Sequence, residues 1–249
     1  MKVDRTMAAM ALGALCSAAA GGEAGSWRVD LELGAVWADH NEVEIPNDGE
    51  GDRFDIADLG TGPYPLGRLT VGWRPWQRHD FQLVIAPLAY EERGTFDRDL
   101  RFAGATFAGG APTDVSYQFN SYRLRYLYSL VDRERWLLEL GGTLFVRDAR
   151  IELTQGGTRA EDSDLGFVPL FALKTSYRVN PRWSLVLDSD FAWAPQGRAI
   201  DLALLLRRQW QSGWDVALGY RTIEGGADND SVYTFAWFNA AVLRVGYQW

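Results

Sequence analysis

A transmembrane antiparallel up-and-down β-barrel of about ten strands is the all-β fold that this sequence predicts, and two observations predict it. Successive segments alternate apolar with polar side chains, which gives each segment one apolar face and one charged face. Tryptophans flank these segments, beside short polar turns or at the chain end, at Trp27, Trp73, Trp76, Trp136, Trp183, Trp210, Trp214 and Trp249. Aromatic girdles around strands with a period of two are typical of barrels that cross a membrane.

Residues 1–24 predict a secretory signal peptide, and residues 25–249 predict a single barrel domain without an internal linker. Lys2 and Arg5 precede an apolar run at 7–20, which is too short for a transmembrane helix. Small residues allow cleavage after Ala20 or Ala24. The only cysteine, Cys16, lies in this leader, so the mature chain would have no thiol for a disulfide, a metal or a nucleophile.

Ten segments with a period of two follow along the chain. The first sets Trp27 and Val29 against Arg28 and Asp30. The segments lie at 27–33, 68–73, 81–85, 122–128, 136–147, 167–176, 183–190, 200–207, 214–221 and 243–249. In mid-strand the charged residues keep to one parity in every segment, which indicates one lipid-facing and one lumen-facing side. Eight or twelve strands remain alternatives, because strand boundaries shift by a few residues.

The connections between these segments differ in length. Short links lie near 75–79, 131–135, 179–182 and 209–213; mostly longer links lie at 39–63, 91–114, 153–164 and 225–230, with a tight one at 194–197. Short periplasmic turns and longer outer loops are the asymmetry of bacterial outer-membrane barrels, and ten strands would place both termini in the periplasm. We therefore expect the bacterial outer membrane, reached through a cleaved N-terminal signal peptide.

A secreted soluble sandwich or lipocalin-like barrel is the alternative, since it too alternates apolar and polar residues. A soluble barrel, however, hides its apolar face inside and has no reason to place aromatic residues at strand ends. The combination therefore favours the membrane barrel. An acidic isoelectric point near 4.9 argues against a nucleic-acid partner.

Three segments resemble outer-membrane β-barrel proteins of Gram-negative bacteria, a small porin-like group. They read Tyr-Gln-Phe-Asn-Ser-Tyr-Arg-Leu at 117–124, Gly-Phe-Val-Pro-Leu at 166–170 and Glu-Gly-Gly-Ala-Asp at 224–228. The resemblance implies the location and the fold, and it carries no activity. It also implies outer-membrane lipids, lipopolysaccharide and, during biogenesis, the barrel assembly machinery as partners.

The charged faces would line the lumen, where arginines and carboxylates nearly balance. A narrow barrel is filled by its own side chains, so a structural network of ion pairs is the simpler interpretation. The alternative is an arginine-rich pocket at the outer mouth for a small carboxylate or phosphate, with Gly219 and Gly246 leaving room. Its candidate residues are Asn120, Arg123, Arg147, Asp190, Arg198, Asp201, Arg221 and Glu224.

Catalytic and metal motifs are scarce. Of the two histidines, His79 lies in a short turn and His40 follows Asp39 at the start of the first long loop. An omptin-like protease or an envelope-lipid hydrolase is therefore a weak alternative to a non-enzymatic barrel. The acidic loop at 48–52 lacks the glycine of a calcium loop, because Arg53 follows it. We expect neither a metal nor a cofactor.

Two functions follow from these features. The first is a narrow channel or a small-solute binding and transport barrel, whose solute is anionic if the arginines select it. The other is a non-conducting structural or surface-interaction barrel that works through its outer loops at 39–63 and 91–114. Phe96, Phe102 and Phe107 would let the second loop fold into the mouth or contact a partner.

Overall fold

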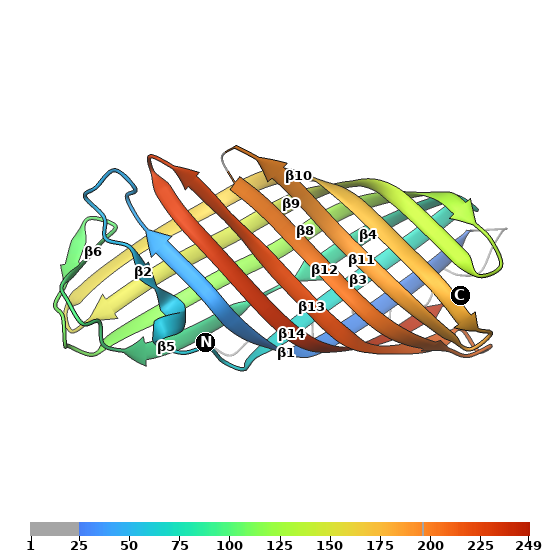
Figure 1. The fold of residues 1–249 in the computed structure, drawn as a ribbon, viewed down its shortest axis with the longest axis horizontal. Helices are drawn as coiled ribbons and strands as arrows, with labels where there is room; N and C mark the ends of the chain where they lie inside the picture. Colours follow the sequence, from blue (N-terminus) through green and yellow to red (C-terminus); the bar gives the residue numbers. More distant parts are fainter. Residues whose placement is uncertain (1–24, 196) are drawn as a thin grey trace, which may run out of the picture.

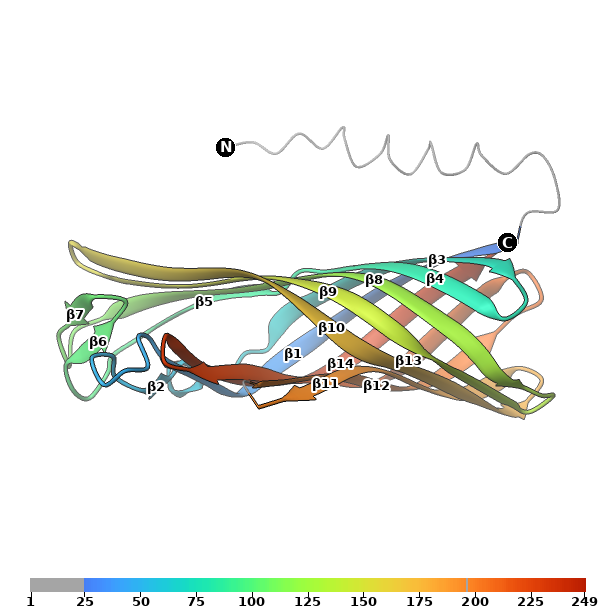
Figure 2. The same ribbon diagram turned by 90° about the horizontal axis from the view of Figure 1, so that it is seen from above.

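A computed structural model, which describes residues 25–195 and 197–249, shows a closed barrel of ten antiparallel strands (Figures 1 and 2). The predicted fold and strand number are confirmed. The predicted signal peptide at 1–24 lies outside the described residues. No helix in the described parts of the chain is long and apolar enough to span a membrane.

Each strand of the wall pairs with the next one in chain order, and β14 pairs with β1 to close the barrel. The wall strands are β1 (Ser26–Glu44), β3 (Tyr64–Trp76), β4 (His79–Ala86), β8 (Thr113–Asp132), β9 (Trp136–Gln155), β10 (Thr158–Asn180), β11 (Trp183–Ala194), β12 (Gly197–Gln209), β13 (Trp214–Asn229) and β14 (Val232–Gln248). After Pro87, β5 (Ala89–Gly94) continues the line of β4 along β8. Proline lacks the N–H that a ladder bond needs, which accounts for the interruption.

The outer surface of the wall is apolar. Leu83, Leu124 and Leu218 are 49%, 58% and 64% exposed, whereas the adjacent residues Gln82 and Arg125 are buried inside the barrel. This is the reverse of a soluble protein, and it is stable only where lipid covers the outer face.

Aromatic residues form a belt at each end of this apolar band. The belt beside the short turns contains the eight predicted tryptophans, and Trp37, Trp193 and Trp237 lie toward the other end. We call these the turn end and the loop end. Trp27 and Trp249 exchange backbone hydrogen bonds of 3.0 Å, so the start of β1 and the chain end lie together at the turn end.

Two of the expected long loops are strands instead. β9 and β10 are joined by only two residues, and so are β13 and β14, so that the hairpins continue past the loop-end aromatic belt (Figure 1). The outward face of these extensions is polar, and there Arg150 pairs with Glu152 and Glu161 at 2.6 Å. Ile151 and Leu153 are buried on the inward face. The apolar face therefore changes from the outside of the barrel to the inside where the lipid ends, and the strands continue.

The two remaining long loops fold into a cap over the loop end (Figure 2). It contains β2 (Phe54–Asp55), the 3-10 helix η1 (Ile56–Asp58) and the hairpin of β6 (Leu100–Phe102) and β7 (Ala105–Phe107). Ile56, Leu100, Phe102 and Phe107 are at most 1% exposed in its core. The loops are therefore an ordered part of the fold.

Candidate functional site: the lumen and the cap

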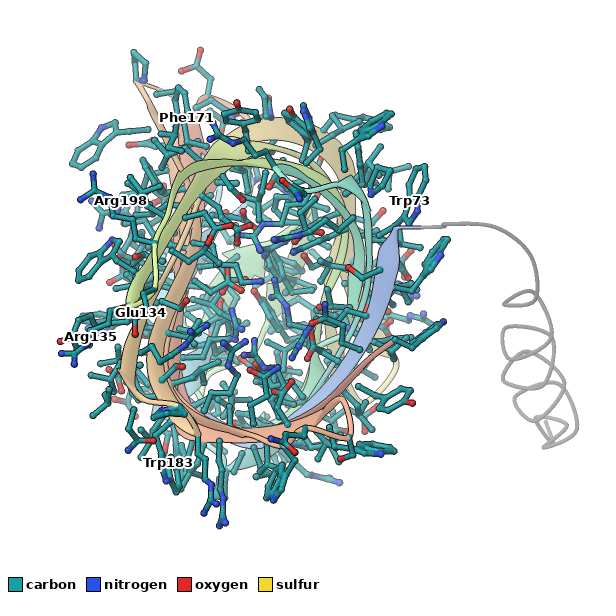
Figure 3. All side chains as sticks on the ribbon, turned by 90° about the vertical axis from the view of Figure 1, so that its right-hand side faces the viewer. Trp73, Glu134, Arg135, Phe171, Trp183 and Arg198 are labelled. Carbon is teal, nitrogen blue, oxygen red and sulfur yellow. The ribbon has the colours of Figure 1, made fainter. Side chains whose placement is uncertain are left out.

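The strand alternation that exposes leucines to lipid turns the charged residues into the lumen. Seen from the turn end, side chains fill the interior of the barrel (Figure 3). Arg123, Arg125 and Arg221 are buried there, as are Glu32, Glu139 and Asp215. Because buried charge is costly unless it is paired, the partners of these groups decide what the lumen can do.

Nearest the loop end, three arginines surround the carboxylate of Asp201. Arg68 donates to it through Nη1 at 2.8 Å, and the Nη1 of Arg123 forms an ion pair with it at 2.7 Å. Arg221 also contacts Asp201 and donates to both oxygens of Glu32, at 2.7 and 3.1 Å. This loop-side cluster joins β1, β3, β8, β12 and β13 across the bore.

The middle of the lumen is held by Arg125, which is 2% exposed. Its guanidinium donates to Asp188 at 2.6 Å, to Asp190 at 2.8 Å and to the amide oxygen of Gln82 at 3.1 Å. Asp190 additionally accepts hydrogen bonds of 2.8 Å from Arg123 and Thr143. These bonds join β8 to β4 and β11, and Asp190 also connects β11 to β9.

A turn-side cluster closes the other half of the bore. Arg28 donates to Asp30 and to Asp215 at 2.6 Å. A methyl group on Gly246 would come within 2.4 Å of the Arg28 and Asp30 side chains. The room that Gly246 leaves is therefore filled by this ion pair.

Two residues of the turn-side cluster were missed because they stand at strand ends. Arg74 lies 2.5 Å from Glu139 and 3.3 Å from Asp80. Asp80 lies two residues before Gln82, and this even spacing from a lumen-facing residue could have placed it inside. Pro75, with Trp73 and Trp76 on either side, instead indicated that a turn begins beside Arg74.

Little space remains between the clusters. A cavity lined by Asp30, Lys174 and Arg244, among others, holds about 20 Å³, and a second one of that size lies beside Leu66 and Phe119. Each is room for about one water molecule. The interpretation of the lumen charges as an ion-pair network is confirmed.

An apolar layer covers the ion pairs on the loop side. Tyr64 stacks on Tyr90 with 4.0 Å between ring centroids, Tyr117 lies 5.1 Å from Tyr90, and Phe238 lies 5.8 Å from Tyr117. All four rings are buried. Two polar bonds fix the stack, since Asn41 donates to the Tyr90 hydroxyl at 2.7 Å and the Tyr64 hydroxyl donates to Glu92 at 2.6 Å.

Above this layer, the cap joins the two long loops. Arg101 donates to Asp52 from its backbone N–H at 2.8 Å and from its guanidinium at 2.9 and 3.1 Å. The edge of Phe54 packs against Phe96 and Phe102 at 5.4 and 5.9 Å. Folding into the mouth and contact with a partner were the two alternatives for loop 91–114, and the structure shows the loop folded over the mouth, with Phe102 and Phe107 in the cap core.

Five of the eight candidate residues face the lumen, and three lie on the outer surface. Arg123, Asp190, Asp201 and Arg221 meet in the network. Arg147 faces the lumen nearer the loop end, where it pairs with Asp164.

The placement of Asn120, Arg198 and Glu224 in the lumen was wrong. Asn120 donates to Asp148 at 3.0 Å on the outer surface, and Arg198 pairs there with Glu224 and lies over the rings of Trp193 and Phe235 (Figure 3). Each of the three is an odd number of residues from a lumen-facing residue of its own strand, so it points outward. Their height in the barrel matches the outer mouth, but the alternation of side chains along each strand places them on the outer face.

The histidines lie away from the lumen network. The Nδ1 of His40 is 3.5 Å from Asp55, at the edge of the cap, and the Nδ1 of His79 is 2.9 Å from the Tyr126 hydroxyl at the turn end. Among the described residues, no group of three or more histidine, cysteine or acidic side chains is arranged to hold a metal ion.

Comparison with solved structures finds the same kind of fold in known proteins. The outer-membrane protease OmpT from Escherichia coli matches with a TM-score of 0.50 and 11% identity, over 90% of this chain and 97% of that one. The attachment invasion protein Ail of Yersinia pestis matches with a TM-score of 0.38 and 9% identity over 89% and 99% of the chains. A Pseudomonas aeruginosa FadL homologue matches with a TM-score of 0.39 and 5% identity over 91% and 90%. Neither a protein-family model nor a curated protein matches the chain.

These likenesses concern the fold. The chain has the fold of the outer-membrane β-barrel proteins of Gram-negative bacteria.

Proposed function

We propose that the protein is a non-conducting, non-enzymatic outer-membrane barrel that works at the cell surface through its folded cap. The observation that carries the proposal is the continuous filling of the bore. Along the axis, the turn-side cluster is followed by Arg125 and its partners, the loop-side cluster, the aromatic layer and the cap core. A hydrated ion would have to displace several of these contacts, which disfavours the channel alternative.

The loop end of the barrel presents negative charge. Exposed carboxylates on the cap, on the strands next to it and on the β13–β14 hairpin include Asp48, Glu50, Asp58, Glu91, Asp97, Asp99, Asp114, Asp228 and Asp230. The exposed arginines of the same end are already paired, for example Arg93 with Asp114 at 3.4 Å and Arg98 with Asp52 at 3.3 Å. Such a surface favours a partner that carries positive charge, because complementary fields speed association and set specificity.

Single-channel recording of the refolded mature protein in a planar bilayer tests the first half of the proposal. We expect no discrete conductance steps from protein that is demonstrably folded. Steps whose ion selectivity changes when Arg221 or Asp190 is neutralised would establish the channel instead, and would contradict the proposal.

Binding of an oligolysine peptide tests the second half. We expect binding that weakens as salt increases. It should weaken several-fold in a variant with Glu91→Gln, Asp97→Asn and Asp230→Asn. Glu134→Gln at the turn end is the matched control and should leave binding unchanged. Equal binding by both variants, or binding that does not respond to salt, would count against a cap-borne surface.

A further inference from the structure

The arginines at the two ends of the barrel differ in whether they form ion pairs. Six exposed arginines stand on or beside the short turns, namely Arg78, Arg133, Arg135, Arg178, Arg182 and Arg208. Only two exposed carboxylates, Asp132 and Glu134, accompany them on these turns. The rim at the turn end is therefore a ring of positive charge, whereas the cap is negative. We call these six residues the arginine rim.

No member of the arginine rim forms an ion pair with a carboxylate of the described residues. The arginines of the loop end all do. Arg53 pairs with Glu44 at 2.9 Å, Arg101 with Asp52 at 2.9 Å and Arg159 with Glu152 at 2.9 Å. The loop-end arginines are thus neutralised by carboxylates of the protein. Those of the rim have no carboxylate partner in the described parts of the chain, although Arg78 donates to the Tyr128 hydroxyl at 3.5 Å.

The rim also lies at a defined depth, directly beyond the turn-end aromatic belt. The Arg208 guanidinium lies 5.0 Å from the centroid of Trp210 and 5.6 Å from that of Trp183. Figure 3 shows Arg135 and Trp183 on the outside of the barrel at this end. Interfacial tryptophans mark the level of lipid headgroups, so the rim lies at the level of the headgroup phosphates.

We propose that the arginine rim binds anionic phospholipid headgroups of the leaflet at the turn end. Guanidinium groups donate two parallel hydrogen bonds to phosphate oxygens, which suits this ligand. A cationic ring near an anionic leaflet is attracted to it over about a Debye length. The rim would hold a shell of such lipids and fix the depth and direction of the barrel.

The test uses the refolded mature protein in bilayers of phosphatidylcholine mixed with phosphatidylglycerol. Spin-labelled analogues of the two lipids report how strongly each associates with the barrel surface. We expect phosphatidylglycerol to associate several-fold more strongly than phosphatidylcholine, and the preference to shrink as salt increases. Equal association of the two lipids would overturn the proposal without any variant being made.

Two matched triple variants locate the site. Arg135→Gln, Arg182→Gln and Arg208→Gln together should abolish most of the preference. Arg93→Gln, Arg98→Gln and Arg159→Gln, which remove three paired arginines at the loop end, should leave it intact. A preference that survives in the rim variant, or falls equally in both, would overturn the assignment. Arginine-to-lysine replacement at the three rim positions should keep most of the preference, because the charge remains.

Discussion

Arg125 shows how a single side chain holds the barrel interior together. Its guanidinium crosses the lumen from β8 to Asp188 and Asp190 on β11, and to Gln82 on β4. Pairing two carboxylates with one arginine satisfies groups that would otherwise be buried without a counter-charge. The residue therefore joins β4, β8 and β11 across the bore.

Replacing Arg125 with methionine should destabilise the barrel by about 3–5 kcal/mol, since two buried carboxylates lose their counter-charge. The free energy of unfolding in urea, followed by tryptophan fluorescence in lipid, measures the effect. Arg93→Met removes an exposed ion pair and should change stability by no more than about 0.5 kcal/mol. A similar loss in the two variants would mean that the network carries no special stability.

Gly246 gives a second prediction about one residue. Gly246→Ala places a methyl group on the Arg28–Asp30 ion pair, which must then shift. We expect a cost of about 1–3 kcal/mol, as for other overpacked interiors. Gly67→Ala on the lipid face is the control, because no atom lies within 4 Å of the added methyl group. Equal stability of the two variants in the same urea titration would contradict this account.

Among the elements, the cap depends on the contact between two loops. Asp52 and Arg101 join them through backbone and side-chain bonds. The hydrogen bond from the Arg101 side chain holds the pKa of Asp52 below its usual value. A carboxylate with a lowered pKa stabilises the folded loop above the unfolded pKa, and this contribution is lost as the pH falls through the folded value.

The cap should therefore loosen in acid before the barrel wall opens. We expect protection of the loop amides at 96–107 against hydrogen exchange to fall as the pH drops below about 4, relative to intrinsic rates. Asp52→Asn should show the weaker protection already at neutral pH and should lose this pH dependence. A variant whose exchange profile matches the parent at every pH would exclude Asp52 as the cause.

For the molecule as a whole, charge is sorted by position along the barrel axis. The loop end carries exposed carboxylates and the lumen balances its charges internally, whereas the turns carry arginines that form no ion pair with any described residue. The lipid-facing band between the belts is apolar. The start of β1 and the chain end also lie together at the turn end. We infer from these layers and ends a single orientation across the membrane.

Single cysteines test this orientation in intact cells. Ser231→Cys in the β13–β14 turn should react with a membrane-impermeant maleimide. Ser212→Cys in the β12–β13 turn should react only after the outer membrane is permeabilised. The parent chain is the control, because its one cysteine lies in the predicted signal peptide. Labelling of Ser212→Cys alone in intact cells would mean that the barrel is inverted.

The side of the barrel wall on which each side chain lies could be predicted from sequence, because side chains alternate along a single strand. A period of two assigned Arg123, Asp201 and Arg221 to the lumen, and the same rule, applied strictly, would have kept Asn120, Arg198 and Glu224 outside. The ends of β9, β10 and β13 were not predicted, because beyond the lipid the outward face becomes polar while residues such as Ile151 and Leu153 are apolar on the inward face, so the pattern of the membrane segment does not continue.

The sequence by itself determined the barrel, its lipid-facing side and its aromatic belts, because these depend on neighbours along one strand, whereas the structure decided between ten strands and the alternatives of eight or twelve. The choice of ion-pair partners was decided only by the tertiary structure. Arg68 and Asp201 are 133 positions apart, and they meet because closure between β14 and β1 fixes the stagger of all ten strands. The same closure brings two distant loops together as a cap, which no local pattern can specify.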